Sequence, residues 1–549
     1  MKVEWHRHWP LAAALVVLWA TIAALLVLGL ERTGGRLVYA LDDTYIHMAI
    51  AKHLARDGVW GVTPYAFGSS SSSPLWTALL AIAHWILGPN EAVPLVLNVV
   101  FASICLGAIS SRLRDRLGAW RSFATLIALI ALTPLPVIVF CGMEHALHIL
   151  LMVWFVFGAA ALPEMERNPS PRRSMPFSML VLAGLLPLVR YESLFAILVV
   201  AALLTARRHH RDAIALVSSA LIPVALYGGY SIWHGWFALP NSVLVKGTPG
   251  GALEAPWRVP SQLLKSSPLA ALIGISFALL ATDWLRGRRQ WARGDVLPGV
   301  FLAVSLIHLQ LASVGSHYRH EAYLMVLGIL GVAWRLFPAG ELEAEPVPGA
   351  TRRRVLQAIR IAVVVLGVAA AWRRGVAFER TPIAMQNIYQ QQYVMGLFLA
   401  RGYSGQPVAA NDIGAINYLA DLRCLDLMGI ASMPIARLRL EGRRKAAEVD
   451  RVVRESGARI AVVYESWFGN QYVTEDRIPE RWGVPLARWV IADNVVCGGD
   501  TVSFFALDPS EREALAAHLQ AFTPLAPNQV IQSGQPAIAG IILDRRDSP

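Results

Sequence analysis

Long apolar segments separated by short polar breaks fill the first two thirds of the chain. Several runs contain about 17–25 apolar residues, enough to cross roughly 30 Å of hydrocarbon. The first run, Leu11 to Leu30, is longer than the core of a cleaved signal peptide and lacks an obvious small-residue cleavage site, which predicts a retained helix. The pattern predicts a polytopic α-helical membrane protein with about eleven transmembrane helices.

Clusters of arginine determine the expected orientation, because basic loops stay in the cytoplasm. The clusters lie at residues 112–121, 172–173, 207–211, 286–293 and 352–354. Each stretch between two clusters can cross twice, with breaks at 133–136 and 141–145, 190–192, 233–265 and 315–321. A last crossing at 355–372 places the C-terminal third outside. The N-terminus is therefore expected in the cytoplasm.

One apolar segment does not fit a crossing. Residues 74–88 are only fifteen long, and a crossing there would put the 112–121 cluster outside. We expect an interfacial helix within a first outer loop, residues 31–91.

The composition changes after Trp372. Charges, turns and short apolar segments at 458–464 and 502–507 predict buried strands, and 509–521 predicts a helix. The expected domains are a transmembrane module, 1–373, and an extracytoplasmic α/β domain, 374–549.

Four cysteines divide between these regions. Cys105 and Cys141 fall in or beside membrane helices and are interpreted as small buried hydrophobes. Cys424 and Cys497 belong to the outer domain, where an oxidising compartment permits a disulfide. We expect this bond, although the sequence alone does not bring the two thiols together.

The overall composition excludes several classes of function. Hydrophobic residues make up 55% of the chain and charged residues 16%, and the mean hydropathy is +0.47. The net charge of +11 does not indicate nucleic-acid binding, because the basic residues cluster between apolar runs. There is no Walker motif, dinucleotide fingerprint or zinc-type cysteine pairing in the sequence.

On the expected topology the polar breaks open on the outer face. Ionisable groups at membrane depth are costly and usually face a cavity or a partner. The set comprises Asp42, Asp43, Glu144, His145, Arg190, Glu192, Asn241, Lys246, His317, Arg319, His320 and Glu321. Their convergence predicts a cleft for an anionic, partly apolar ligand.

The acid pair Asp42–Asp43 begins a predicted amphipathic helix that runs through Arg56, with His47 one turn after Asp43. A structural alternative is that one of the acids only caps this helix. Glu144–His145 and Arg190–Glu192 have a similar alternative, in which polar groups at helix ends satisfy one another.

These segments resemble a known family. Asp42–Asp43 followed by Ser-Ser-Ser-Pro-Leu-Trp (71–76) is similar to bacterial GT-C glycosyltransferases, including family 39-like enzymes and terminal arabinofuranosyltransferases of mycobacterial type. Further matching segments are 142–147, 190–192, 235–246, 411–418 and 425–429. The resemblance implies a catalytic acid in the first outer loop, a polyprenyl-phosphate sugar donor and transfer on the outer face of a bacterial plasma membrane. The chain has no clear Asp-x-Asp motif, so we expect a metal-independent enzyme without a cofactor.

The residues suit an inverting type of displacement. A basic side chain, Arg190, Lys246 or Arg319, would stabilise the phosphate leaving group. A carboxylate would take the proton of the acceptor hydroxyl. Asp42 is the first choice for this base, with Asp43 orienting it or sharing the role. The expected substrate contacts are Glu144 and His145 on the acceptor, with His47, Glu192, Asn241 and Tyr318 completing the cleft.

Two other classes of function remain open. A lipid-linked glycan flippase or transporter would often show repeats and midplane breaks, whereas this sequence shows no repeat and its breaks lie at one face. In a non-catalytic envelope assembly protein the acid pair would be dispensable. The sugar, the acceptor (a glycan, lipid or protein) and the linkage are not specified by the sequence.

Overall fold

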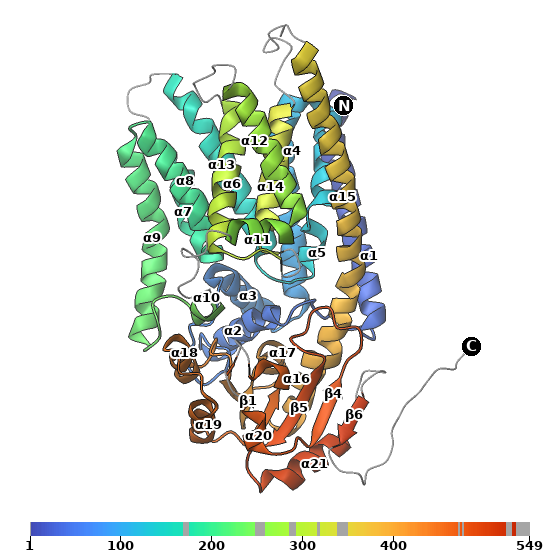
Figure 1. The fold of residues 1–549 in the computed structure, drawn as a ribbon, viewed down its shortest axis with the longest axis vertical. Coiled ribbons are helices and arrows are strands. Elements are labelled where there is room, and N and C mark those ends of the chain that lie inside the picture. Colours follow the sequence, from blue (N-terminus) through green and yellow to red (C-terminus); the bar gives the residue numbers. More distant parts are fainter. Residues whose placement is uncertain are drawn as a thin grey trace, which may run out of the picture. The chain divides into compact units, whose positions relative to one another are not determined.

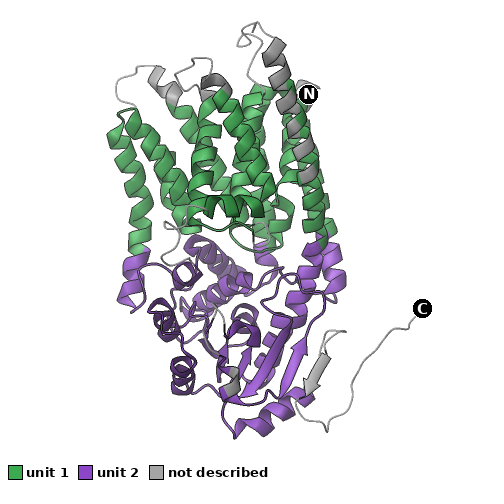
Figure 2. Cartoon of the chain, viewed as in Figure 1, with its two compact units in different colours: residues 1–24, 95–226, 250–379 green, residues 25–94, 227–249, 380–549 purple. Residues whose placement is uncertain are grey.

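The computed structural model describes residues 2–167, 175–246, 258–284, 293–315, 319–336, 350–469, 473–474, 477–522 and 530–533. The chain separates into two compact units (Figure 2). Unit 1 contains residues 1–24, 95–226 and 250–379, and unit 2 contains residues 25–94, 227–249 and 380–549. The first outer loop and the C-terminal region therefore belong to the same unit, and the expected division at residue 373 stays a prediction.

Unit 1 is built from helices, some of which continue into segments of unit 2. They are α1 (Lys2–Arg32), α4 (Ala92–Leu132), α5 (Leu135–Val139), α6 (His145–Arg167), α7 (Phe177–Val189), α8 (Ser193–Ala206), α9 (His210–Trp233), α11 (Arg258–Lys265), α12 (Ser267–Trp284), α13 (Arg293–Leu311), α14 (Ala322–Leu336) and α15 (Ala350–Ile388). Figure 1 shows most of them as a bundle.

Among the described residues, four helices are long and apolar enough to cross a membrane. They are His8–Arg32, Ala92–Arg114, His145–Leu162 and His210–Trp233. The pair α11 and α12, bent by 114°, makes a fifth if it is one span. Five shorter apolar helices accompany them, so the expected number of eleven crossings stays a prediction.

The expected breaks in the apolar runs coincide with helix ends. The turn 190–192 separates α7 from α8, and residues 140–144 separate α5 from α6. The arginine-rich segment 112–121, expected as a loop, contains a break in α4, where two helices meet at the non-helical Gly118. The φ of 73° at Gly118 is a conformation that glycine adopts without steric cost.

Unit 2 combines the first outer loop with an α/β domain. Its helices are α2 (Asp43–Asp57), α3 (Pro74–Leu87), α10 (Asn241–Lys246), the π-helix η2 (Tyr389–Tyr393), α16 (Val394–Gly402), α17 (Gly414–Leu419), α18 (Met433–Leu440), α19 (Ala446–Glu455), η3 (Glu465–Trp467), α20 (Pro479–Trp482) and α21 (Glu511–Ala521). The strands are β1 (Pro407–Ala410), β2 (Arg423–Asp426), β3 (Ile460–Val463), β4 (Ala487–Val490), β5 (Thr501–Ala506) and β6 (Val530–Ser533). The strands and helix expected near 458–464, 502–507 and 509–521 are confirmed as β3, β5 and α21.

The six strands form one mixed sheet in the order β2-β1-β3-β5-β4-β6 (Figure 1). Strands β2, β1 and β3 are parallel, and the pairs β3–β5, β5–β4 and β4–β6 are antiparallel. Strand β3, Ile-Ala-Val-Val, is wholly buried, as expected for a strand covered on both faces. The carboxyl ends of β1 and β3 lie at the same edge, where parallel sheets commonly bind ligands.

The expected disulfide is wrong, because Cys424 and Cys497 are both free thiols. Cys424 lies in β2 at one edge of the sheet, and Cys497 follows β4, on the other side of β1, β3 and β5. The Cys497 thiol donates to Gln392 Oε1 over 3.3 Å. The two cysteines belong to one domain, but the strands between them keep the two thiols apart.

Candidate active site

The Asp42 side chain caps the N-terminus of α17 and not that of α2, the helix that Asp42 precedes. Its side chain makes no capping bond to α2. Instead, Oδ2 accepts the main-chain N–H of Gly414 at 2.7 Å, and Oδ1 accepts that of Ala415 at 2.8 Å. These N–H groups begin α17 and have no partner within their own helix. The alternative in which Asp42 caps α2 is therefore wrong.

A second carboxyl group, that of Asp412, faces Asp42. Asp412 lies two residues beyond the carboxyl end of β1. Its carboxyl group is hydrogen bonded to that of Asp42. Burial raises the pKa of Asp42 well above its ordinary value, and the adjacent Asp412 charge raises it further. Burial also raises the pKa of Asp412, against the hydrogen bonds from Asp42 and Gln392. Two buried acids at hydrogen-bonding distance share a proton, because both cannot ionise together.

Side chains from the π-helix and from the end of β3 fix Asp412. Gln392 Nε2 donates to Asp412 Oδ2 at 2.9 Å and to the Tyr464 hydroxyl at 2.6 Å. The Tyr464 hydroxyl lies 2.6 Å from Gln391 Oε1 and 3.3 Å from Asp412 Oδ2. The wider turn of η2 directs Gln391 and Gln392 to the same hydroxyl, and such π-helical turns often occur at functional sites.

Asp43 differs from Asp42 in exposure and in partner. Lys246, the last residue of α10, donates from Nζ to Asp43 Oδ1 at 2.8 Å. The side chain of Asp43 is 24% exposed and that of Lys246 is 44% exposed. The start of α2 and the end of α10 therefore present one solvent-accessible carboxylate beside one solvent-accessible ammonium group.

Two residues expected to contact substrate join segments of unit 2. His47 is buried and its Nδ1 lies 2.8 Å from Thr77 Oγ1 of α3. Asn241 donates from Nδ2 to the main-chain oxygen of Gly429, and its main-chain N–H donates to Ser69. Both thereby support the loops around Asp43 and Lys246.

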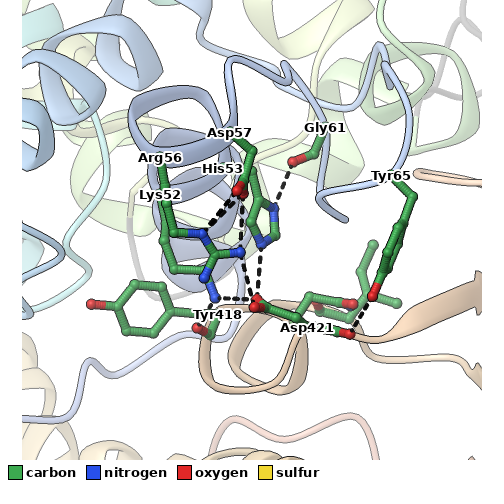
Figure 3. A network of polar contacts seen from close by, with 10 residues as sticks. Lys52, His53, Arg56, Asp57, Gly61, Tyr65, Tyr418 and Asp421 are labelled. Atoms are coloured by element: carbon green, nitrogen blue, oxygen red, sulfur yellow. Dashed lines mark hydrogen bonds and ion pairs between the residues drawn. The ribbon is translucent and has the colours of Figure 1, made fainter. Parts of the chain in front are cut away.

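A second cluster fixes the far end of α2 (Figure 3). Lys52 Nζ donates to Asp421 Oδ1 at 2.9 Å and to the main-chain oxygen of Tyr418 at 2.6 Å. Arg56 pairs with Asp421 at 2.9 Å, and His53 Nε2 lies 3.5 Å from the same carboxylate. Asp421 follows α17 by two residues, so α2 is attached to the α17 segment at both ends.

The remaining expected residues lie in unit 1. Arg190 bridges two acids, with nitrogen–oxygen distances of 2.7 Å to Glu144 and 2.6 Å to Glu192. His145, next to Glu144 in the sequence, is buried. Arg319 Nη1 lies 3.0 Å from Met143 Sδ. The alternative in which Glu144, Arg190 and Glu192 satisfy one another agrees with these ion pairs. Tyr318 and His317 lie outside the described residues.

The structure thus collects Asp42, Asp43 and Lys246 in unit 2, and Glu144, Arg190 and Glu192 in unit 1. The sequence interpretation missed Asp412, Gln392 and Tyr464 as members of the first group. Asp412 and Tyr464 each come soon after a short apolar run, Pro407–Ala410 or Ile460–Val463, which is a sign of residues at the ends of buried parallel strands.

Metal binding has no candidate group in the described parts of the chain, where no three His, Cys, Asp or Glu side chains are arranged to hold an ion. The expected independence of a metal ion stays a prediction.

Comparison with known proteins identifies the fold. A family model described as a domain of unknown function (DUF8728) matches residues 386–505, and no curated protein matches in sequence. ArnT from Cupriavidus metallidurans, solved with undecaprenyl phosphate bound, aligns with a TM-score of 0.51 and 14% identity over 89% of this chain and 98% of ArnT.

Two further solved structures align more weakly. The Archaeoglobus fulgidus oligosaccharyltransferase in its apo form gives a TM-score of 0.49 and 11% identity, over 90% of this chain and 74% of its own. The arabinofuranosyltransferase AftD from Mycobacteria gives 0.42 and 14%, over 89% and 40%. At such identities the likeness to ArnT shows a shared fold, a helical membrane module with a C-terminal sheet domain.

Proposed function

We infer that this chain, which has the GT-C fold, is a glycosyltransferase that moves a monosaccharide from a polyprenyl-phosphate donor to an acceptor outside the cytoplasm. The acceptor is a cell-envelope glycan, a glycolipid or a protein. The protein is a multi-pass protein of a bacterial plasma membrane, with a cytoplasmic N-terminus and an extracytoplasmic C-terminal domain. The reaction is an inverting displacement without a metal ion.

The observation that carries this proposal is the Asp43–Lys246 pair. Transfer from a phosphate carrier needs a carboxylate for the acceptor hydroxyl and a cation for the phosphate leaving group. Asp43, on the loop for which the resemblance implied a catalytic acid, and Lys246, at the end of α10, supply both groups, with Oδ1 and Nζ 2.8 Å apart.

The structure supports Asp43, rather than Asp42, as the general base. Both oxygens of Asp42 already accept main-chain N–H groups, and its carboxyl group shares a proton with Asp412. A base must be accessible and ionised, and Asp43 meets both conditions through its exposure and its ammonium partner. Asp42 then acts as a positioning residue that holds the start of α2, and hence Asp43, against the start of α17.

The displacement balances in one step. The Asp43 carboxylate takes the proton of the acceptor hydroxyl as the acceptor oxygen bonds to the anomeric carbon. The bond from that carbon to the phosphate oxygen breaks on the opposite side, and the negative charge stays on the polyprenyl phosphate. Lys246 separates from Asp43 far enough to neutralise that phosphate.

Arg190 has a structural role within unit 1. Arg190 is held between Glu144 and Glu192, so we propose that it positions these acids more than it binds phosphate. In unit 2, His47 and Asn241 hold the loops that carry Asp43 and Lys246.

The experiment is incubation of the purified full chain with a panel of radiolabelled polyprenyl-phosphate sugars, scoring release of polyprenyl phosphate. One donor should be consumed by the wild-type protein and not by Asp43→Asn. Absence of turnover with every donor, in the presence of envelope extract as acceptor, would contradict the proposal.

A further inference from the structure

A cleft lies in unit 2, at the far end of α2 from Asp43. It has a volume of about 540 Å³, and Lys52, Asn90, Glu91 and Tyr418 contribute to its lining. Lys52 is nine residues after Asp43, which places it about 13 Å further along the helix. Between them Tyr45 is fully buried against the rings of Tyr418 and Tyr393. The cleft is therefore distinct from the Asp43–Lys246 site.

The cleft carries one cation and one anion, each fixed by neighbours. The Lys52 ammonium group uses two of its three N–H donors on Tyr418 and Asp421, as Figure 3 shows, which leaves one for a ligand. Glu91 accepts the Tyr393 hydroxyl at 3.0 Å on Oε1. A carboxylate has lone pairs beyond this single bond, so Glu91 can also accept from a ligand.

The charges around the cleft cancel locally. Lys52 and Arg56 face Asp421 and Asp57, with ion-pair distances of 2.9 to 3.0 Å. Arg36 interacts with Glu91 and Tyr393. A ligand with a net negative charge finds no excess cation here, whereas a zwitterion can place its anion on Lys52 and its cation on Glu91.

An exposed apolar strip leads into the same cleft. The last turns of α3 present Ile82, Trp85, Ile86 and Leu87 to the outside, with Trp85 76% exposed. Residues 89–92, which follow directly, line the cleft. A short helix with an exposed apolar face suits the membrane interface, where tryptophan is enriched.

We propose that this cleft binds the headgroup of a zwitterionic phospholipid of the phosphoethanolamine type, with the phosphate on Lys52, the amine on Glu91 and the acyl chains along α3. The lipid would fix the first outer loop at the membrane surface. The site is independent of the glycosyl transfer proposed above, and its test needs no turnover.

The test is native mass spectrometry of the purified full chain with added phosphatidylethanolamine, phosphatidylglycerol or undecaprenyl phosphate. We expect phosphatidylethanolamine to bind about tenfold more tightly than phosphatidylglycerol, as one additional charge-assisted hydrogen bond predicts. Glu91→Gln should abolish this preference, and Lys52→Met should weaken binding of both phospholipids. Glu513→Gln, an exposed carboxylate of α21 in the same unit, is the matched control.

Trp85→Ala keeps the test independent of folding, because the side chain is exposed, and it should weaken phospholipid binding with the headgroup preference intact. Equal binding of the two phospholipids, or variants indistinguishable from Glu513→Gln, would overturn the proposal. Tighter binding of undecaprenyl phosphate that Lys52→Met removes would also overturn it, since the cleft would then be an anion site.

Discussion

Asp42 Oδ2 and the main-chain N–H of Gly414 lie 2.7 Å apart although 372 residues separate them in sequence. The contact joins the residue that precedes α2 to the start of α17. Asp412 lies in the turn before α17. The Asp42 carboxyl group therefore both caps α17 and contacts the Asp412 carboxyl group. The geometry of the proposed site depends on this contact.

Replacement of Gly414 by alanine should break the contact. A Cβ at this position would lie 2.5 Å from Asp42 Oδ2 and 2.1 Å from the Asp42 main-chain oxygen. Such overpacking typically costs about 1–3 kcal/mol. We expect a lower melting temperature and reduced transfer, measured by thermal unfolding and by the release assay. Gly229→Ala, where a Cβ has no neighbour within 4 Å, should leave both unchanged; equal behaviour of the two variants would exclude a tight Asp42–Gly414 contact.

The shared proton of Asp42 and Asp412 predicts a pH dependence. The folded-state pKa of Asp42 is raised above its unfolded value, so the pair's stabilisation is complete below about pH 4 and is lost as the pH rises through the raised pKa. Asp412→Asn should remove this dependence, because the asparagine amide can donate to an ionised Asp42. The measurement is the melting temperature across pH 4–8 for both proteins. Identical slopes would show that the pair does not share a proton.

Asp421 should be important for stability but not for the chemistry. It receives Lys52 and Arg56 from α2, and Lys52 is buried. Asp421→Asn leaves these cations without their carboxylate and should cost about 1–3 kcal/mol. Thermal unfolding measures this loss, with Glu513→Gln as the control. A variant as stable as the control would mean that the cluster in Figure 3 does not hold α2.

Cys424 and Cys497 should both react with a thiol reagent after denaturation without reductant, since neither is in a disulfide. Mass spectrometry of the labelled peptides gives the result directly. If neither cysteine reacts, the two thiols form the disulfide expected from the sequence, and the free thiols of the structure are contradicted.

The sequence predicted what depends on local pattern. Apolar length identified the helices, and the polar segment Arg190–Glu192 marked a true helix break. The short apolar runs at Ile460–Val463 and Thr501–Ala506 were recognised as strands. The fold expected from the resemblance, a helical membrane module with a C-terminal sheet domain, is confirmed by the likeness to ArnT.

Contacts between segments far apart in the chain could not be predicted from the sequence. Asp412 and Tyr464 meet only because β1 and β3 are neighbours in the sheet, which no local pattern specifies. The choice of Asp42 as base likewise ignored the N–H groups of Gly414 and Ala415 that occupy it.

The central claim is that Asp43 is the general base. The most direct test is the single-turnover release of polyprenyl phosphate from the active radiolabelled donor, compared between wild type and Asp43→Asn. Loss of a general base typically slows the reaction about 10²–10⁴-fold, so we predict that decrease with donor binding and melting temperature retained. Asp42→Asn should instead lower the melting temperature, since the amide cannot accept both N–H groups. Release by Asp43→Asn at the wild-type rate would contradict the account.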